Sequence, residues 1–212
     1  MATKQTTEDL IRRLAAEPAP ARFAEGRIAL TVLGALVLGL GLYLVIHGPR
    51  PDLAQSLAGG VTVAKPLLPS LLLVTGLTAA LRLARPGQRA GFWVWGVVVV
   101  AVAGASLILA TMAQDGVAAM KVGAAAFKCL SMIVLLSALP LVLGIAHLAR
   151  GATLRPALSG AMLGMASGAG AAAGYALACT EDAPLFFVVW YGAAILTATA
   201  VGALLGARWL KW

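Results

Sequence analysis

Residues 157–178 read ALSGAMLGMASGAGAAAGYALA, without one charged side chain. A helix needs about 20 residues to cross the hydrocarbon core of a bilayer, and lipid cannot satisfy the backbone of an open strand. Three glycine pairs have the GxxxG spacing that lets helices approach closely: Gly160 with Gly164, Gly164 with Gly168, and Gly170 with Gly174. We therefore expect a membrane-spanning helix at the centre of a bundle, with packing inside the monomer favoured over a dimer interface.

The same apolar character recurs in five other segments, at 28–46, 63–83, 91–112, 129–148 and 185–206. The composition agrees, because 61% of the 212 residues are hydrophobic and 11% are charged, whereas soluble domains carry about 25% charged residues. The sequence therefore predicts an all-α, polytopic integral membrane protein with a six-transmembrane-helix bundle over 28–212. Residues 1–27 are expected to form a separate segment with a short helix.

The basic residues are distributed unevenly along this pattern. If the N-terminus is cytoplasmic, twelve of the sixteen Lys and Arg residues lie inside, and the other four, Arg50, Lys65, Lys121 and Lys128, lie outside. Cytoplasmic loops of membrane proteins are enriched in Lys and Arg, so both termini are expected in the cytoplasm. The net charge of +8 reflects this orientation. Without a dense basic run it does not indicate a nucleic-acid partner.

The first 27 residues contain one short amphipathic pattern. Thr6 and Asp9 have the spacing of a capping box at a helix start, and Pro18 ends the helix. The candidate partner-binding residues are Asp9, Leu10, Ile11, Arg12, Arg13 and Leu14. A helix that lies on lipid headgroups is the alternative to a helix that docks into the groove of a cytosolic protein. The mixed charges favour the protein partner.

Motifs of common enzymes are absent from the sequence. There is no Walker loop, HExxH, GxSxG or metal-type CxxC, so we expect no catalytic residue, no metal site of those types and no cofactor. No predicted span carries a charge near its middle, which argues against a proton or ion pump. A small carrier or channel for a neutral solute, and a structural subunit of a membrane complex, remain as alternatives to a regulatory protein.

The two cysteines, Cys129 and Cys179, border the fourth and fifth predicted spans and fall on the outer side in this topology. Glu181 and Asp182 follow the second cysteine. In an oxidising compartment two such thiols can form a disulfide if their Cα atoms come within about 7 Å. Two interpretations stay open. One is a permanent disulfide, and the other is a switch whose thiols are oxidised or bind a soft metal, with Glu181 or Asp182 as extra ligands.

Several stretches of the sequence carry a resemblance to a known family. They are DLIRRLA at 9–15, RPDL at 50–53, CL at 129–130 followed by PL at 140–141, RGATLRP at 150–156, and YALACTEDAPLF at 175–186 followed by WY at 190–191. Together they resemble the NrsF-type family of bacterial six-span membrane anti-sigma factors, along essentially the whole chain. The CxEDxPLF block within the last stretch is the most specific of these patterns.

The resemblance implies a negative regulator of an extracytoplasmic-function sigma factor in the bacterial inner membrane. The cytoplasmic N-terminal segment would hold the sigma factor away from RNA polymerase, and Cys129 and Cys179 would respond to stress such as toxic metals or oxidants. Family members often have His beside each cysteine and Pro after the second, where this chain has Lys128, Ala178 and Thr180. This departure favours a thiol–disulfide change over a metal site. We hypothesise that the change shifts the fifth span against the fourth, with the proline inside the fourth span as a bend.

Overall fold

The computed structural model describes residues 6–16, 25–58, 60–85, 87, 91, 93–115 and 124–210. Over these residues it contains eight α-helices and no strand, which confirms the predicted all-α class for this part of the chain. The helices are α1 (Thr7–Ala16), α2 (Glu25–His47), α3 (Leu53–Ala58), α4 (Gly60–Leu83), α5 (Trp93–Asp115), α6 (Ala124–Leu148), α7 (Pro156–Tyr175) and α8 (Pro184–Trp209).

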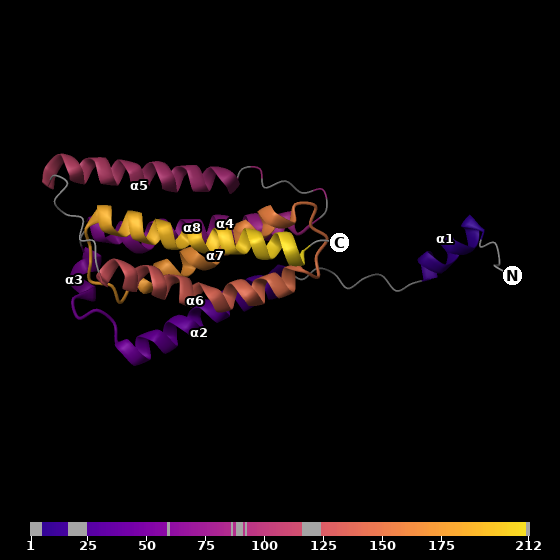
Figure 1. The fold of residues 1–212 in the computed structure, drawn as a ribbon, viewed down its shortest axis with the longest axis horizontal. Coiled ribbons are helices and arrows are strands. Elements are labelled where there is room, and N and C mark those ends of the chain that lie inside the picture. Colours follow the sequence, from indigo (N-terminus) through magenta and orange to yellow (C-terminus); the bar gives the residue numbers. More distant parts are fainter. Residues whose placement is uncertain are drawn as a thin grey trace.

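The six long helices, α2 and α4 to α8, run lengthwise through one elongated bundle, and α1 lies apart from it (Figure 1). Successive long helices run in opposite directions, so the start of α2 and the end of α8 share one end of the bundle. The short helix α3 lies at the opposite end, together with the start of α6 and the end of α7. We call this end, which carries Cys129 and Cys179, the thiol end.

Four of the described helices are long and apolar enough to cross a membrane, judged by length and composition. These segments are Glu25–His47, Thr62–Leu83, Ala126–Leu148 and Pro184–Trp209, and the apolar part of α5 is the shorter Trp95–Ala110. The predicted span at 157–178 forms α7, which is rich in alanine and glycine and is not among the four. The structure is compatible with a membrane protein, and the number of six spans stays a prediction.

α7 lies at the centre of the bundle, where it packs against α8, α4 and α6. Its glycines allow this close packing. A methyl group added to Gly160 would collide with the carbonyl oxygen of Gly202, and one added to Gly164 would collide with the carbonyl oxygen of Ala198. The third glycine pair of α7 faces leucine side chains of α2. The predicted use of the small residues for packing inside the monomer is confirmed.

Two helix ends position the polar residues of the thiol end. α2 ends at His47 because Gly48 adopts a left-handed backbone with φ of +77°, and the Gly48 N–H donates to the carbonyl of Leu44 at 2.8 Å. α7 ends at Tyr175, three residues before the predicted boundary at 178. Cys179 therefore lies in the loop between α7 and α8, and its N–H donates to the Tyr175 carbonyl at 3.1 Å.

α1 begins with one of the two contacts of a capping box. The Asp9 N–H donates to the Thr6 hydroxyl oxygen at 3.4 Å, and the Thr6 hydroxyl donates to the Asp9 carboxylate at 2.6 Å. Glu8 and Asp9 also place negative charge in the first turn, which stabilises a helix through its dipole. The predicted N-terminal helix is thus present and capped.

Candidate functional site

The two thiols lie side by side at the thiol end. Cys129 is in the second turn of α6, Cys179 follows the end of α7, and their sulfur atoms are 3.6 Å apart. Both cysteines are free and buried, with 3% and 6% of their surface exposed. A disulfide has an S–S distance of about 2.0 Å, so the pair needs a small approach to form one. The chemistry available is loss of two electrons and two protons to an oxidant.

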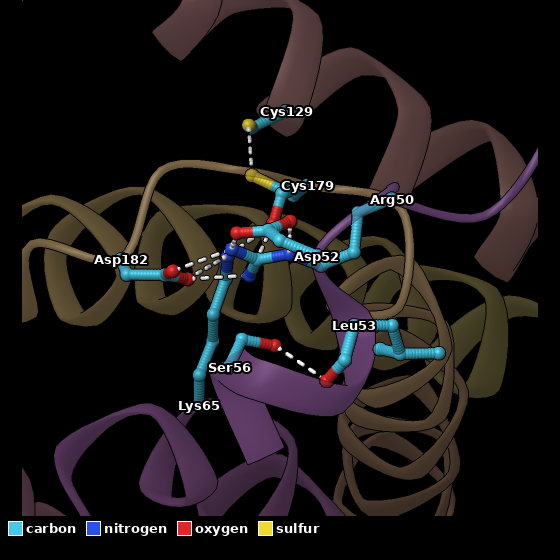
Figure 2. Close-up of polar contacts among 8 residues, drawn as sticks. All are labelled: Arg50, Asp52, Leu53, Ser56, Lys65, Cys129, Cys179 and Asp182. Carbon is cyan, nitrogen blue, oxygen red and sulfur yellow. Dashed lines mark hydrogen bonds and ion pairs between the residues drawn. The ribbon is translucent and has the colours of Figure 1, made fainter. Parts of the chain in front are cut away.

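Two cations hold the main chain of Cys179 in place (Figure 2). Its carbonyl oxygen accepts a hydrogen bond from Lys65 Nζ at 2.6 Å and another from Arg50 Nη1 at 3.2 Å. A backbone hydrogen bond joins the same two segments of the chain: the Arg50 N–H donates to the Leu177 carbonyl at 3.0 Å. The loop after α7 is thereby tied to α4 and to the loop between α2 and α3.

Two carboxylates neutralise these cations. Arg50 donates to both oxygens of Asp182, at 2.7 and 2.6 Å, and to both oxygens of Asp52, each at 2.8 Å. Lys65 Nζ is 3.2 Å from Asp182. We call Arg50, Asp52, Lys65 and Asp182 the charge cluster. Its formal charges sum to zero, because it holds two cations and two carboxylates.

The zero net charge of the charge cluster matters because its two cations are buried. Only 4% of Arg50 and 1% of Lys65 is exposed, and an unpaired buried charge costs several kcal/mol of desolvation. The carboxylates are more accessible, at 31% of the Asp182 side chain and 47% of the Asp52 side chain. The cluster is therefore cationic toward the protein interior and carboxylate-rich toward its surface.

The contacts shift the ionisation of the groups that lie outside the helices. Burial raises the pKa of the Asp182 carboxyl, but its contacts with Arg50 and Lys65 outweigh burial and leave that pKa below its usual range. The hydrogen bond from Arg50 likewise lowers the pKa of Asp52. With the Cys129 thiol as donor, the hydrogen bond between the sulfurs lowers the pKa of Cys179; burial opposes this shift and the Lys65 ammonium supports it. The site thus favours a Cys179 thiolate.

Aromatic rings pack beneath the thiols. Tyr175 of α7 lies between Tyr43 of α2, with ring centroids 5.6 Å apart, and Tyr191 of α8, at 6.2 Å. Phe187 packs on Tyr191 at 6.5 Å, and Lys65 Nζ is 5.9 Å from the Tyr191 ring centroid. These rings belong to the same buried core as both cysteines. The thiol pair therefore borders an aromatic part of this core.

The structure brings the outer residues that the sequence singled out to one site. Cys129, Cys179 and Asp182 meet there (Figure 2). Glu181 is half-buried and precedes Asp182 in the loop after α7. Arg50 and Lys65 were not predicted as site residues. Both served as topology markers, and Arg50 also as part of the RPDL stretch that resembles the family. The sequence did contain one signal for this site, because Lys65 is a charged residue just inside an apolar segment and lies next to two prolines.

The candidate partner-binding residues lie on α1, apart from the thiol end (Figure 1). Asp9, Ile11 and Arg12 are exposed. The side chains of Leu10, Arg13 and Leu14 lie outside the described part of the structure.

Metal binding was one of the interpretations left open by the sequence. Among the described residues, no group of three or more His, Cys, Asp and Glu side chains is placed to hold a metal ion. Asp182, a suggested extra ligand, is instead engaged by Arg50 and Lys65. The geometry at the thiol end therefore suits thiol–disulfide chemistry better than metal coordination.

Fold and site together define a class: an all-helical bundle of long apolar helices with a buried thiol and charge site at one end. Comparison with known proteins gives the family. A family model described as "NrsF: Negative regulator of sigma F" matches residues 14–212, and the chain belongs to this family. The predicted family resemblance is confirmed, and so is the expectation of a regulatory rather than an enzymatic protein.

Two relatives cover nearly the whole chain. The "Anti-sigma-F factor NrsF" of Caulobacter vibrioides is 35% identical, over 97% of this chain and 99% of the relative. The "Probable anti-sigma-F factor NrsF" of Azospira oryzae is 32% identical, again over 97% and 99% of the two chains. No solved structure matches the chain.

Proposed function

We propose that this protein is a membrane-bound anti-sigma factor that holds an extracytoplasmic-function sigma factor, of the sigma-F kind named in its relatives, at the bacterial inner membrane. Residues 1–27 form the cytoplasmic sigma-binding segment and residues 28–212 the six-span membrane domain. An oxidising signal outside the cytoplasm acts on Cys129 and Cys179 and releases the sigma factor.

The near-full-length similarity to proteins named as anti-sigma-F factors carries this proposal. The structure supports it in two ways. The thiols are paired at 3.6 Å, and α1 presents the exposed Ile11 next to the exposed Arg12, which suits a helix that docks into a groove. The uneven distribution of Lys and Arg supports a thiol end outside the cytoplasm and an α1 inside it.

The first test is co-purification of a sigma factor with the full chain from its native cells. The tagged protein is extracted in mild detergent, with and without residues 2–27. We expect the intact chain to retain a sigma factor and the shortened chain to lose it. A sigma factor recovered equally with both forms would contradict the role of the N-terminal segment.

Point changes in α1 sharpen this test. Ile11→Asp puts a charge on the exposed apolar position and should reduce recovered sigma factor at least tenfold. Ala16→Ser changes an exposed residue at the end of the helix and serves as the matched control. Loss of binding in both variants would indicate damage to the segment rather than loss of a docking contact.

A further inference from the structure

α4 makes polar contacts at both ends of the bundle. At the thiol end, Lys65 in its second turn contacts the Cys179 carbonyl and Asp182. At the opposite end, Arg85 follows α4 and forms an ion pair with Glu25, the first residue of α2. Ala84 N–H donates to Ala80 O and Arg85 N–H donates to Arg82 O, both at 3.1 Å, so Arg85 continues the last turn of the helix.

We propose that α4 couples the thiol pair to the segment before Glu25, with Lys65 as the contact at one end and Arg85 as the contact at the other. This inference rests on the proposed function, because it describes how a thiol change would reach the sigma-binding segment. It assigns the role to α4 instead of the shift of α7 against α6 that the sequence suggested.

The coupling begins with the movement of the loop that holds Cys179. Bond formation brings the sulfur atoms of Cys129 and Cys179 from 3.6 Å to about 2.0 Å. Cys129 is fixed within α6, whereas Cys179 lies in the loop after α7, so in this proposal the loop moves toward α6. The Cys179 carbonyl accepts hydrogen bonds from Lys65 and Arg50. Both cations are buried, so losing a hydrogen-bond acceptor costs free energy. Lys65 therefore moves with the Cys179 carbonyl.

The contact between α4 and α7 is close enough to carry a movement. A Cβ atom added to Gly76 of α4 would be 2.9 Å from the Met162 carbonyl oxygen of α7, and Leu77 of α4 belongs to the same buried cluster as Leu163 of α7. Such a packed interface transmits strain instead of absorbing it. Helix shifts of about 1–2 Å are a common form of switching, so a displacement at Lys65 moves α4 as one element.

The ion pair between Arg85 and Glu25 can respond to a movement of α4. The Arg85 side chain is 54% exposed and the Glu25 side chain 30%, and exposed ion pairs contribute little to stability. The pair therefore breaks or re-forms easily as α4 moves. Glu25 is the first residue of α2 and follows residues 17–24, which connect it to α1. A change in this ion pair therefore acts on the start of α2, where the proposed sigma-binding segment meets the bundle.

Hydrogen exchange tests the coupling without a sigma factor. The full chain, in lipid nanodiscs, is compared before and after oxidation with diamide, whose N=N bond accepts the two electrons and two protons released as two thiols become a disulfide. Exchange is followed by mass spectrometry in peptides that cover 25–35, and disulfide formation by a maleimide gel shift. Oxidation should raise exchange at the start of α2 at least threefold in the wild-type chain.

Two variants and two controls locate the effect in α4. Lys65→Met keeps the buried volume and removes the ammonium, and Arg85→Gln removes the far ion pair; both should form the disulfide and lose the exchange response. Lys128→Met, at an exposed lysine beside Cys129, and Arg208→Gln, at an exposed arginine near the end of α8, should keep it. An unchanged response in Lys65→Met, or no response in the oxidised wild-type chain, would overturn the proposal.

Sigma-factor binding and its release on oxidation are measured separately on the same variants, purified from the native cells. If the exchange response depends on Lys65 and Arg85 but no sigma factor is bound, the α4 coupling stands and the proposed function fails. If a sigma factor is bound and is released on oxidation in Lys65→Met as in the wild-type chain, the proposed function stands and the coupling through α4 is wrong.

Discussion

Asp182 and Asp52 look alike in the sequence but have different partners in the structure. Asp182 contacts both buried cations, Arg50 and Lys65, whereas Asp52 contacts only Arg50 and is more exposed. Loss of Asp182 therefore leaves two buried cations under-compensated, and loss of Asp52 leaves Arg50 with its bidentate bond to Asp182.

We expect Asp182→Asn to destabilise the protein by about 2–3 kcal/mol, below the usual cost of breaking a fully buried pair because Asp182 is partly exposed. Thermal unfolding of the detergent-solubilised chain, followed by tryptophan fluorescence, measures the change. Asp52→Asn is the matched control and should cost much less stability, because exposed ion pairs contribute little. Equal losses of stability in the two variants would show that Asp182 stabilises the buried cations no more than Asp52 does.

The same carboxylate gives a pH dependence of known sign. Because the folded pKa of Asp182 lies below the ordinary value of about 3.9, its stabilisation is fully present above that value. It is lost as the pH falls through the lower folded pKa. The difference in stability between the wild-type chain and Asp182→Asn should therefore shrink in acid and persist at neutral pH.

The thiol pair should react asymmetrically at Cys179. Its pKa is lowered by the hydrogen bond from Cys129, and only the thiolate is alkylated. We expect the midpoint of the rate–pH profile for iodoacetamide at Cys179, measured by mass spectrometry, to lie below the ordinary thiol value of about 8.5.

Two substitutions at position 129 test whether a hydrogen-bond donor at that position lowers the pKa of Cys179, independently of the Cys129 sulfur atom. Cys129→Ser keeps a hydroxyl donor and should keep the low midpoint, whereas Cys129→Ala removes the donor and should move the midpoint upward. The same midpoint in both variants would show that the hydrogen bond does not set the reactivity of Cys179.

At the scale of elements, α7 and α8 meet through main-chain atoms. Gly160 of α7 lies against Gly202 and Gly206 of α8, and a Cβ atom at Gly160 would be 2.8 Å from the Gly206 Cα. A carbonyl or a Cα in a helix cannot rotate away as a side chain can. Such close contact provides van der Waals packing where lipid supplies no hydrophobic driving force.

Gly160→Ala should therefore destabilise the bundle by about 2 kcal/mol, as overpacking does in a well-filled core. Gly192→Ala is the matched control on α8, because a Cβ atom there meets nothing within 4 Å. It should be neutral or stabilising, since alanine favours helix by about 1 kcal/mol over glycine. Thermal unfolding compares the two, and equal stability would contradict the tight α7–α8 contact.

At the scale of the whole molecule, the bundle has two unlike ends. The thiol end holds the buried charge cluster, and the other end holds the start of α2 and the end of α8 (Figure 1). Twelve of the sixteen Lys and Arg residues belong to the second end in the predicted topology, where Arg50, Lys65, Lys121 and Lys128 are the other four. This asymmetry predicts that the second end faces the cytoplasm.

Labelling of intact cells measures the orientation. In a chain whose two native cysteines are replaced by serine, Gln55→Cys places a thiol on α3, and Ala152→Cys places one between α6 and α7; both positions are exposed. A membrane-impermeant maleimide should label the first variant in intact cells and the second only after lysis. The reverse pattern would overturn the predicted topology.

The helical class, the capped N-terminal helix, the central place of the glycine-rich segment and the family could all be predicted from the sequence. These follow from local patterns, because apolar length, residue size and capping spacing act within one element. The contact between Cys129 and Cys179, and the burial of Arg50 and Lys65 as partners of Asp182, come from the packing of the helices. The two cysteines are 50 positions apart, and Asp182 is 132 and 117 positions from its two cations. These contacts depend on how α4, α6 and α7 pack, which no local pattern specifies.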